Sequence, residues 1–287
     1  MSAASDAIRC AGVPREQGFA QGLVSREALR ERCAARGPLA RAQDALGLLD
    51  SASSRWLRDL RRHFPHQGEW LEGAARGAGL ALPALVRAAR ASHRDLPRVL
   101  VACEGAGVAR IGCALPPHTI LRRMVPEGRF RTLELALPWL PAPWLGVNEA
   151  GLAVAATSGA RAGARCAAPG TLFARDCLER FESVGSALAW CLGRPAAPGA
   201  SLLFADAAGE LAGVELAPKD RRVRRPERGV LVLGADAARA AAIEKRLAEG
   251  SRDALAFAQA LGTDAGECAS ADAAGRRLLL AGEEIAL

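Results

Sequence analysis

The sequence predicts an α+β fold, because helices and strands occur in separate runs along the chain. In the first third, apolar residues recur every three or four positions, as they do in helices that pack on a core. After Leu96 and Pro97 the pattern changes to short segments with apolar residues at every second position, which is typical of strands. Separate runs of helices and strands favour α+β over a regularly alternating α/β fold.

Three helical segments are expected before this change, at residues 13–36, 38–64 and 68–93. The first opens with Pro14, a residue favoured in the first turn of a helix. Gly18 and Gly22 lie about one turn apart and would let another backbone approach this helix closely. The run EGAARGAGL in the third segment is rich in small residues and implies similarly close packing.

The rest of the chain is expected to contain strands interrupted by two helical pairs. Strand segments are predicted at 98–115, 118–125, 130–137, 144–158, 201–216, 229–234 and 276–287, and helices at 171–181, 184–193, 235–249 and 251–262. Val99, Val101 and Cys103 share one face of the first strand segment. Asn148 to Gly151 is expected to form a tight turn between two strands.

Composition excludes several classes of protein. The net charge is +7, but the arginines are interleaved with acidic residues, and the densest basic block, RRVRRPERG (221–229), lacks the aromatic residue that stacks on single strands. We therefore expect a solvated basic surface and no nucleic-acid partner. No apolar stretch approaches the ~20 residues that cross a bilayer, so no membrane association is expected. The start MSAASDAIRC lacks a secretory signal, which predicts a cytoplasmic protein with free thiols.

Common catalytic and metal motifs are missing from the sequence. There is no G-x-x-x-x-G-K-[ST], H-E-x-x-H, G-x-S-x-G or C-x-x-C. The segment GAARGAG (73–79) lies inside helical sequence instead of after a strand, which argues against dinucleotide binding. The histidines are scattered, and His63 and His66 fit a capping or surface role. No metal or cofactor site is predicted.

Cys103 is a candidate nucleophile because of its position. It lies where the helical third meets the first strand, directly after the small residue Ala102. Backbone cleavage before Cys103 would give the new chain start an α-amino group with a pKa of about 8, close enough to neutrality to act as a base for the adjacent thiol. From spacing alone, a buried strand cysteine is the alternative.

A series of segments in order along the chain carries a family resemblance. The segments are GVPREQGFAQG (12–22), GEWLEGAARGAGLAL (68–82), ACEGAGVAR (102–110), ILRRMV (120–125), GVNEAGLAV (146–154), RDCLERFESVGSALAW (175–190) and LLFADAAGELAGVEL (202–216), of which GVNEAGLAV is the most specific. Together they resemble the acyl-coenzyme A:6-aminopenicillanic acid acyltransferase family of N-terminal nucleophile hydrolases, which is related to the choloylglycine and acid-amide hydrolases.

This resemblance implies a four-layer αββα sandwich and a self-processing enzyme. Cleavage between Ala102 and Cys103 would separate a helical N-terminal segment (1–102) from the catalytic region (103–287), the two fragments remaining associated as one domain. Cys103 would then attack a small-molecule amide or thioester and form an acyl-enzyme, with no metal or cofactor but with acyl-coenzyme A as an optional co-substrate. The resemblance puts Arg122, or its neighbour Arg123, close to the cysteine.

Two further positions carry a role by resemblance. Asn148, the sole asparagine of the chain, would lie at a turn beside the site, although an asparagine there also fits a simple turn cap. Ser158 stands where choloylglycine relatives have an oxyanion-supporting asparagine, and it is the candidate oxyanion donor.

The chain also departs from the family pattern. Glu104 replaces the usual Thr or Ser, the aspartate expected at 124–126 is missing, and a second asparagine is absent near Ser201. The family's Thr-Asn-His stretch is replaced at 234–236. These losses support a second hypothesis, a non-catalytic family member that binds an acyl ligand or a protein partner. A third is a thiol enzyme that acts without cleavage through Cys103 or Cys113 and His118.

Overall fold

A computed structural model describes residues 7–34, 46–92, 95–105, 108–157, 170–195, 199–216, 220–250, 254–264, 267–280 and 283–287. The helices are α1 (Pro14–Val24), α2 (Arg26–Ala34), α4 (Ser51–His63), α5 (Pro65–Ala78), α6 (Leu82–Ala91), α7 (Leu172–Arg180), α8 (Val184–Gly193), α9 (Ala237–Glu249) and α10 (Ala254–Leu261). The strands are β1 (Ile8–Gly12), β2 (Leu100–Gly105), β3 (Val108–Ala114), β4 (Ile120–Pro126), β5 (Thr132–Ala136), β6 (Leu145–Asn148), β7 (Leu152–Thr157), β8 (Ala200–Asp206), β9 (Leu211–Leu216), β10 (Arg221–Arg224), β11 (Val230–Leu233), β12 (Cys268–Asp272), β13 (Arg277–Leu280) and β14 (Glu283–Ala286).

The described strands form two sheets. An eight-stranded sheet has the order β1-β4-β5-β6-β7-β8-β9-β10, and a six-stranded sheet has the order β11-β2-β3-β12-β13-β14. The strands pair antiparallel except β1, which runs parallel to β4 and places Ile8 opposite Arg122. Mostly antiparallel pairing agrees with the predicted α+β class.

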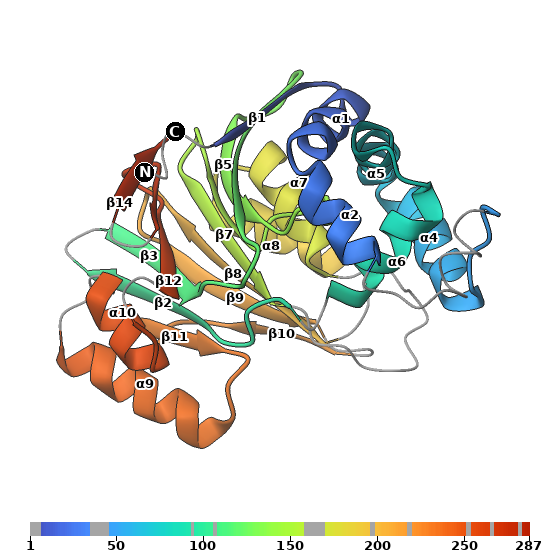
Figure 1. The fold of residues 1–287 in the computed structure, drawn as a ribbon. Coiled ribbons are helices and arrows are strands. Elements are labelled where there is room, and N and C mark those ends of the chain that lie inside the picture. The colour runs from blue at the N-terminus through green and yellow to red at the C-terminus, as the bar shows by residue number, and fades with distance from the viewer. Residues whose placement is uncertain are drawn as a thin grey trace.

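The two sheets face each other between two helical layers, as Figure 1 shows. Helices α7 and α8 pack on the outer side of the eight-stranded sheet, against β6 and β7 and against β8 and β9. Helices α9 and α10 pack on the outer side of the six-stranded sheet, against β11, β3 and β12. The layer order is therefore αββα, as predicted.

The N-terminal helices form a group beside β1 and β4 in which α1 and α5 lie in very close contact (Figure 1). Glycines from both helices make this contact possible. A methyl group at Gly18 or Gly22 would overlap the carbonyl oxygen of Trp70 or Ala74, and one at Gly73 or Gly77 would overlap the backbone of α1. The close approach expected from the glycine spacing is thus confirmed.

Several element boundaries differ from the predicted ones. The first predicted helix is two helices, α1 and α2, separated at Ser25. The third is also two, α5 and α6, because Gly79 adopts a left-handed conformation (φ +66°) that ends α5. Strands β1, β10 and β12 were not predicted, and the predicted strand at 276–287 contains both β13 and β14.

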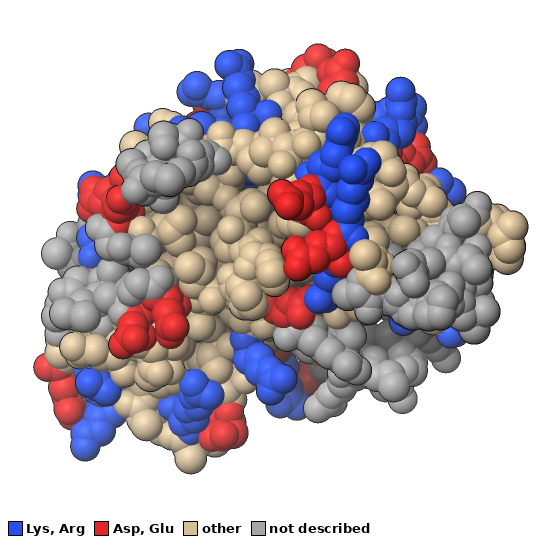
Figure 2. All heavy atoms as spheres, in the orientation of Figure 1, with Lys and Arg blue, Asp and Glu red and all other residues tan. Residues whose placement is uncertain are grey.

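Charged side chains are dispersed over the face of the molecule seen in Figure 2. Figure 2 shows basic and acidic groups interspersed around a broad uncharged area on the face in view. In the block RRVRRPERG, Arg222, Arg224 and Arg225 pair with acidic side chains, and Arg221 donates to the carbonyl oxygen of Leu192 at the end of α8. Among the described residues, no helix is both long and apolar enough to cross a membrane.

Candidate functional site

Cys103 lies on β2, an inner strand of the six-stranded sheet, between β11 and β3. It is opposite Val230 on one side and Arg110 on the other, and its side chain is 1% exposed. Its side chain packs with those of Val99 and Val101, which confirms that the three share a face. That face belongs to the apolar cluster under α9 and α10, which includes Ile243 and Phe257, and not to the core between the sheets.

The peptide between Ala102 and Cys103 is part of the same inner strand. Ala102 is opposite Leu231 and Ile111, so both residues of the peptide lie between paired neighbours. The next residue is also fixed, since the backbone N–H of Glu104 donates to the carbonyl oxygen of Gly229 at 2.9 Å. In the intact chain, this peptide is held inside a sheet.

Arg122 occupies a different part of the molecule. It lies on β4 of the eight-stranded sheet, and its guanidinium is fully buried. Nε donates to Glu134 at 2.6 Å, and Nη1 donates to Oε1 of Gln21 in α1 at 2.9 Å. Nη2 donates to the carbonyl oxygen of Pro141 at 2.7 Å. The partners named here therefore come from β5, α1 and the loop after β5, while Cys103 lies on the other sheet.

A second buried arginine extends this group of polar side chains. Arg175 of α7 bonds to Glu179 at 2.7 Å, to the carbonyl oxygen of Pro141 at 3.3 Å and to Gln17 of α1. Burial lowers the pKa of Arg175, but attraction from Glu179 and Glu134 outweighs burial, and its pKa lies above the ordinary value. Two buried arginines are thus matched by two glutamates in what we call the Arg122–Arg175 network.

The sequence carries a signal for this network that motif reading missed. Gln17 and Gln21 are four residues apart, each followed by a glycine that contacts α5, so both glutamines face the interior. Thr132 and Glu134 alternate with leucines on a strand whose residues are all buried. Polar side chains on the buried face of a helix and on a buried strand indicate that they hydrogen-bond to one another or to another buried polar group.

Asn148 caps the turn between β6 and β7, one of the two roles that the sequence allowed for it. Its Nδ2 donates to the carbonyl oxygens of Leu178 and Phe181, both at 2.8 Å, and its Oδ1 accepts from the backbone N–H of Leu152, also at 2.8 Å. The side chain is fully buried. It joins the β6–β7 turn to the last turn of α7, and these three bonds occupy both ends of its amide group.

Ser158, the candidate oxyanion donor, lies outside the described residues. Its neighbour Thr157 ends β7, is 4% exposed, and accepts a hydrogen bond from the backbone N–H of Ser201 at 3.2 Å. The hydroxyl of Thr157 therefore already has a backbone partner on β8.

Cys113 and His118 belong to separate surroundings. Cys113 is fully buried in the core that includes the region between the sheets, and burial raises the pKa of its thiol well above the ordinary value. His118 is exposed, and its ring centroid lies 5.9 Å from that of Trp139. A thiol that is hard to ionise is a poor nucleophile, so this environment disfavours Cys113 as the nucleophile of the third hypothesis.

One polar cavity of about 340 Å³ adjoins the Arg122–Arg175 network. Its lining includes Gln17, Arg175 and Glu179 together with His66 and Asp176. Nε2 of His66 lies 2.5 Å from Oδ1 of Asp176, within ion-pair distance but without hydrogen-bond geometry. His66 is therefore partly buried against α7 and lies at the cavity, not simply at the surface as the sequence indicated.

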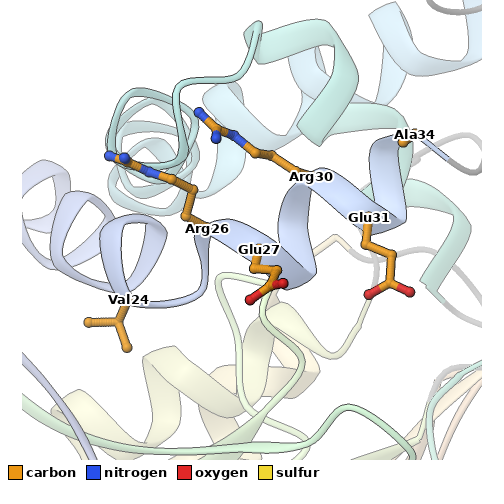
Figure 3. A pocket seen from close by; sticks show the side chains of 6 residues that line it. All are labelled: Val24, Arg26, Glu27, Arg30, Glu31 and Ala34. Atoms are coloured by element: carbon orange, nitrogen blue, oxygen red, sulfur yellow. The ribbon is translucent and has the colours of Figure 1, made fainter.

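A second hollow of about 670 Å³ lies along α2 (Figure 3). Arg26 and Arg30 point toward α5, where they donate to the carbonyl oxygens of Gly77 and Ala78 at 2.9 and 3.1 Å. Glu27 and Glu31 point away from these arginines. Neither this hollow nor the polar cavity is lined by Cys103, Arg122 or Asn148.

The comparison with known families concerns the middle of the chain. Residues 126–233 match the sequence model of the family described as acyl-coenzyme A:6-aminopenicillanic acid acyl-transferase. The match confirms the predicted resemblance to this acyltransferase family. It includes Asn148 and Ser158, but it begins after Cys103 and Arg122. No curated protein sequence matches the chain.

Solved structures show remote likeness. The Caenorhabditis elegans ortholog of N-acylethanolamine-hydrolyzing acid amidase is 14% identical with a TM-score of 0.45, over 64% of this chain and 93% of that one. Penicillin V acylase from Agrobacterium tumefaciens is 14% identical with a TM-score of 0.38, over 53% and 57%. Conjugated bile acid hydrolase from Clostridium perfringens is 16% identical with a TM-score of 0.35, over 52% and 57%.

Proposed function

We propose that this protein is a self-processing amidohydrolase or acyltransferase that uses Cys103 as its nucleophile. The thiol attacks the carbonyl carbon of Ala102, the peptide nitrogen leaves as the amine of Cys103, and water hydrolyses the resulting thioester. The freed amine then acts as base for the thiol, because its ordinary pKa is about 8. The mature enzyme attacks a small-molecule amide or thioester, and water or an acceptor amine releases the acyl group.

The observation that carries this proposal is the position of Cys103 on an inner strand of an αββα sandwich whose middle segment matches the acyltransferase family. The order of motifs around residue 103 gives it further support. Because the thiol is buried in the intact chain, the uncleaved protein is an inactive precursor. Cleavage splits β2 and frees the residues before Cys103 to leave the sheet.

The remaining predicted residues take supporting roles in this proposal. Ser158 supplies a hydroxyl to the oxyanion, at a step where one lost donor commonly costs about 10²- to 10³-fold in rate. Arg122 and Asn148 are positioning residues, because their hydrogen bonds hold α1, α7 and the β6–β7 turn on the eight-stranded sheet. Acyl-coenzyme A remains an optional acyl donor.

A second candidate is a non-catalytic member of the family that binds an acyl ligand or a protein partner. One specific observation favours it. The polar groups of Arg122 and Asn148 are hydrogen-bonded to structural partners, and the Cys103 thiol packs among apolar side chains. In this alternative the intact chain is the final form, and Ala102–Cys103 stays an ordinary strand peptide.

Intact mass of the purified protein during prolonged incubation separates the two candidates. We expect fragments 1–102 and 103–287 from the wild type and from Cys113→Ala, which removes a buried thiol on the neighbouring strand. Cys103→Ala should stay intact. Cleaved protein should then form an acyl adduct at Cys103 with a thioester substrate. A wild-type chain that remains whole and unacylated would exclude the enzyme and leave the ligand-binding candidate.

A further inference from the structure

Two cysteines on different helices meet in the outer helical layer of the eight-stranded sheet. Cys177 lies in the second half of α7, and Cys191 lies near the end of α8. Both side chains are fully buried, and their sulfur atoms are 3.6 Å apart in S–H···S contact. A disulfide bond is about 2.05 Å long, so the sulfur atoms must approach by only about 1.5 Å to be joined.

The backbones that carry these two thiols are fixed. The carbonyl oxygen of Cys177 accepts from the N–H of Phe181 at 3.0 Å, which ends α7. The carbonyl oxygen of Cys191 accepts from Arg221, whose guanidinium also bonds to Leu192 at 2.6 Å. At the start of α8, the N–H of Val184 donates to Asp206 at 3.0 Å. Both ends of α8 are thus held, and Asn148 holds the last turn of α7 through the carbonyl oxygens of Leu178 and Phe181.

Aromatic packing also holds α7 against α8. The ring of Trp190 lies edge-on to Phe173, with centroids 5.2 Å apart, and is tilted 6.0 Å from Phe181. The residue next to Trp190 is Cys191, so the contact between the thiols is part of a packed helix–helix interface. Closing the bond needs the two sulfur atoms to approach by about 1.5 Å within this interface.

We propose that Cys177 and Cys191 form a latent disulfide that closes when the chain folds in the presence of a low-molecular-weight disulfide. The two thiols lose two electrons and two protons and become one S–S bond. The glutathione-type disulfide accepts them, and its own S–S bond breaks to give two thiols. In the reducing cytoplasm predicted from the sequence, the pair stays reduced.

Burial determines when this bond can form. In the folded chain, burial raises the pKa of Cys177 well above its ordinary value, so the thiolate needed for exchange is scarce. Folding under oxidising conditions avoids this barrier, because the thiols are accessible before the helices pack. The closed bond would join α7, which carries Arg175 and Glu179 and holds Asn148, to α8.

The test is refolding of denatured, reduced protein in oxidising and in reducing glutathione buffers. We expect the oxidised product to be about 2 Da lighter, with one linked peptide pair containing Cys177 and Cys191. Its midpoint of thermal unfolding should rise by about 6–12 °C, from the entropy of closing a loop of roughly 15 residues. Cys177→Ala and Cys191→Ala should each abolish the mass change and the thermal shift.

Cys10→Ala serves as the matched control, because it removes a buried thiol from β1 and should leave both signals unchanged. If refolding yields are low, native protein is treated with the thiol oxidant diamide just below its unfolding midpoint, where local opening admits the reagent. Free alkylation of both cysteines after either treatment, or separate glutathione adducts on each, would overturn the proposal. This inference is independent of the proposed acyl chemistry.

Discussion

The Arg122–Arg175 network and the layer around Cys103 are both buried, but they are built from opposite kinds of side chain. In the first, two arginines, two glutamates and two glutamines bond to one another and to the carbonyl oxygen of Pro141. In the second, Cys103 is surrounded by residues such as Val101, Val232 and Phe257. Arg122, the one candidate site residue in the first group, therefore bonds to structural partners, while the candidate nucleophile lies in an apolar layer.

The two regions differ in whether their buried side chains need hydrogen-bond partners. Burying an arginine is costly unless its donors are hydrogen-bonded, and the bonds of Arg122 and Arg175 link β4, β5, α1 and α7 into one interdependent group. An apolar layer makes no such demand on residue 103, whose side chain packs among apolar neighbours. The intact chain is consequently stabilised by Arg122 whether or not Cys103 ever reacts.

The largest effect is expected from Glu134→Ala, which removes the partner of Arg122. The guanidinium would be left buried without its counter-ion, and we expect the free energy of unfolding to fall by about 3–5 kcal/mol. Urea denaturation measures the change. The matched control is Glu210→Ala, which breaks the exposed pair with Arg225 and should cost at most about 1 kcal/mol. Equal effects of the two variants would contradict the structural role of the network.

Asn148→Ala tests whether the sole asparagine is structural or catalytic. The change leaves the carbonyl oxygens of Leu178 and Phe181 and the N–H of Leu152 without their partner, and we expect a loss of about 2–4 kcal/mol in unfolding free energy. The midpoint of urea unfolding and the rate of cleavage at Cys103 should be measured together. A variant of unchanged stability that no longer cleaves would instead place Asn148 in the catalytic machinery.

Two buried thiols, Cys10 near the Arg122–Arg175 network and Cys268 near Cys103, should make the stability of the protein depend on pH in the alkaline range. Burial raises the pKa of Cys10, near Arg122, and of Cys268, in the cluster of Cys103, each to about 11. A thiol whose pKa is higher in the folded than in the unfolded chain keeps its proton more firmly when folded. Its contribution to the free energy of unfolding is therefore complete below about pH 8.5 and is lost as the pH rises through about 11. We expect the free energy of unfolding to fall by about 2–3 kcal/mol for each of these thiols over that pH range.

Urea unfolding at a series of pH values checks this loss. Cys10→Ala and Cys268→Ala should each flatten the decline in unfolding free energy above pH 8.5, and the double variant should flatten it most. A decline that is unchanged in the double variant would show that other groups cause it.

The sequence predicts much of the architecture but little of the arrangement around Cys103. Period-two patterning correctly places Val99, Val101 and Cys103 on one face. The pattern does not reveal whether that face meets the other sheet or the helices, because both surroundings are apolar. β1 was not predicted because in only five residues, IRCAG, the alternation of buried Ile8 and Cys10 with exposed Arg9 is too brief to recognise. β10 is an exposed edge strand of mostly arginine, which looks like loop sequence.

Interactions distant in sequence explain the remaining misses. The partners of Arg122 include Gln21 and Pro141, and that of His66 is Asp176, so none of these pairs could be recognised from local spacing. Glycine spacing did predict a close helix contact because the requirement for no side chain is visible in the sequence itself. The sequence did not reveal which helix is the partner, and the structure shows that it is α5, whose Gly73 and Gly77 in EGAARGAGL lie against the backbone of α1.

The smallest expected effect distinguishes packing from intrinsic helix propensity. Gly18→Ala places a methyl group against the carbonyl oxygen of Trp70, so α1 must shift away from α5 and with it Gln17 and Gln21 of the Arg122–Arg175 network. We expect a loss of about 1–3 kcal/mol in unfolding free energy. Gly185→Ala in α8 is the matched control, because nothing lies within 4 Å of the added methyl group. It should stabilise the protein by about 0.4–1 kcal/mol. Thermal unfolding measures both changes. A loss of stability for Gly18→Ala with a gain for Gly185→Ala would attribute the loss to the contact between α1 and α5. A gain in both variants would mean that α1 can move away from α5 without disturbing the Arg122–Arg175 network.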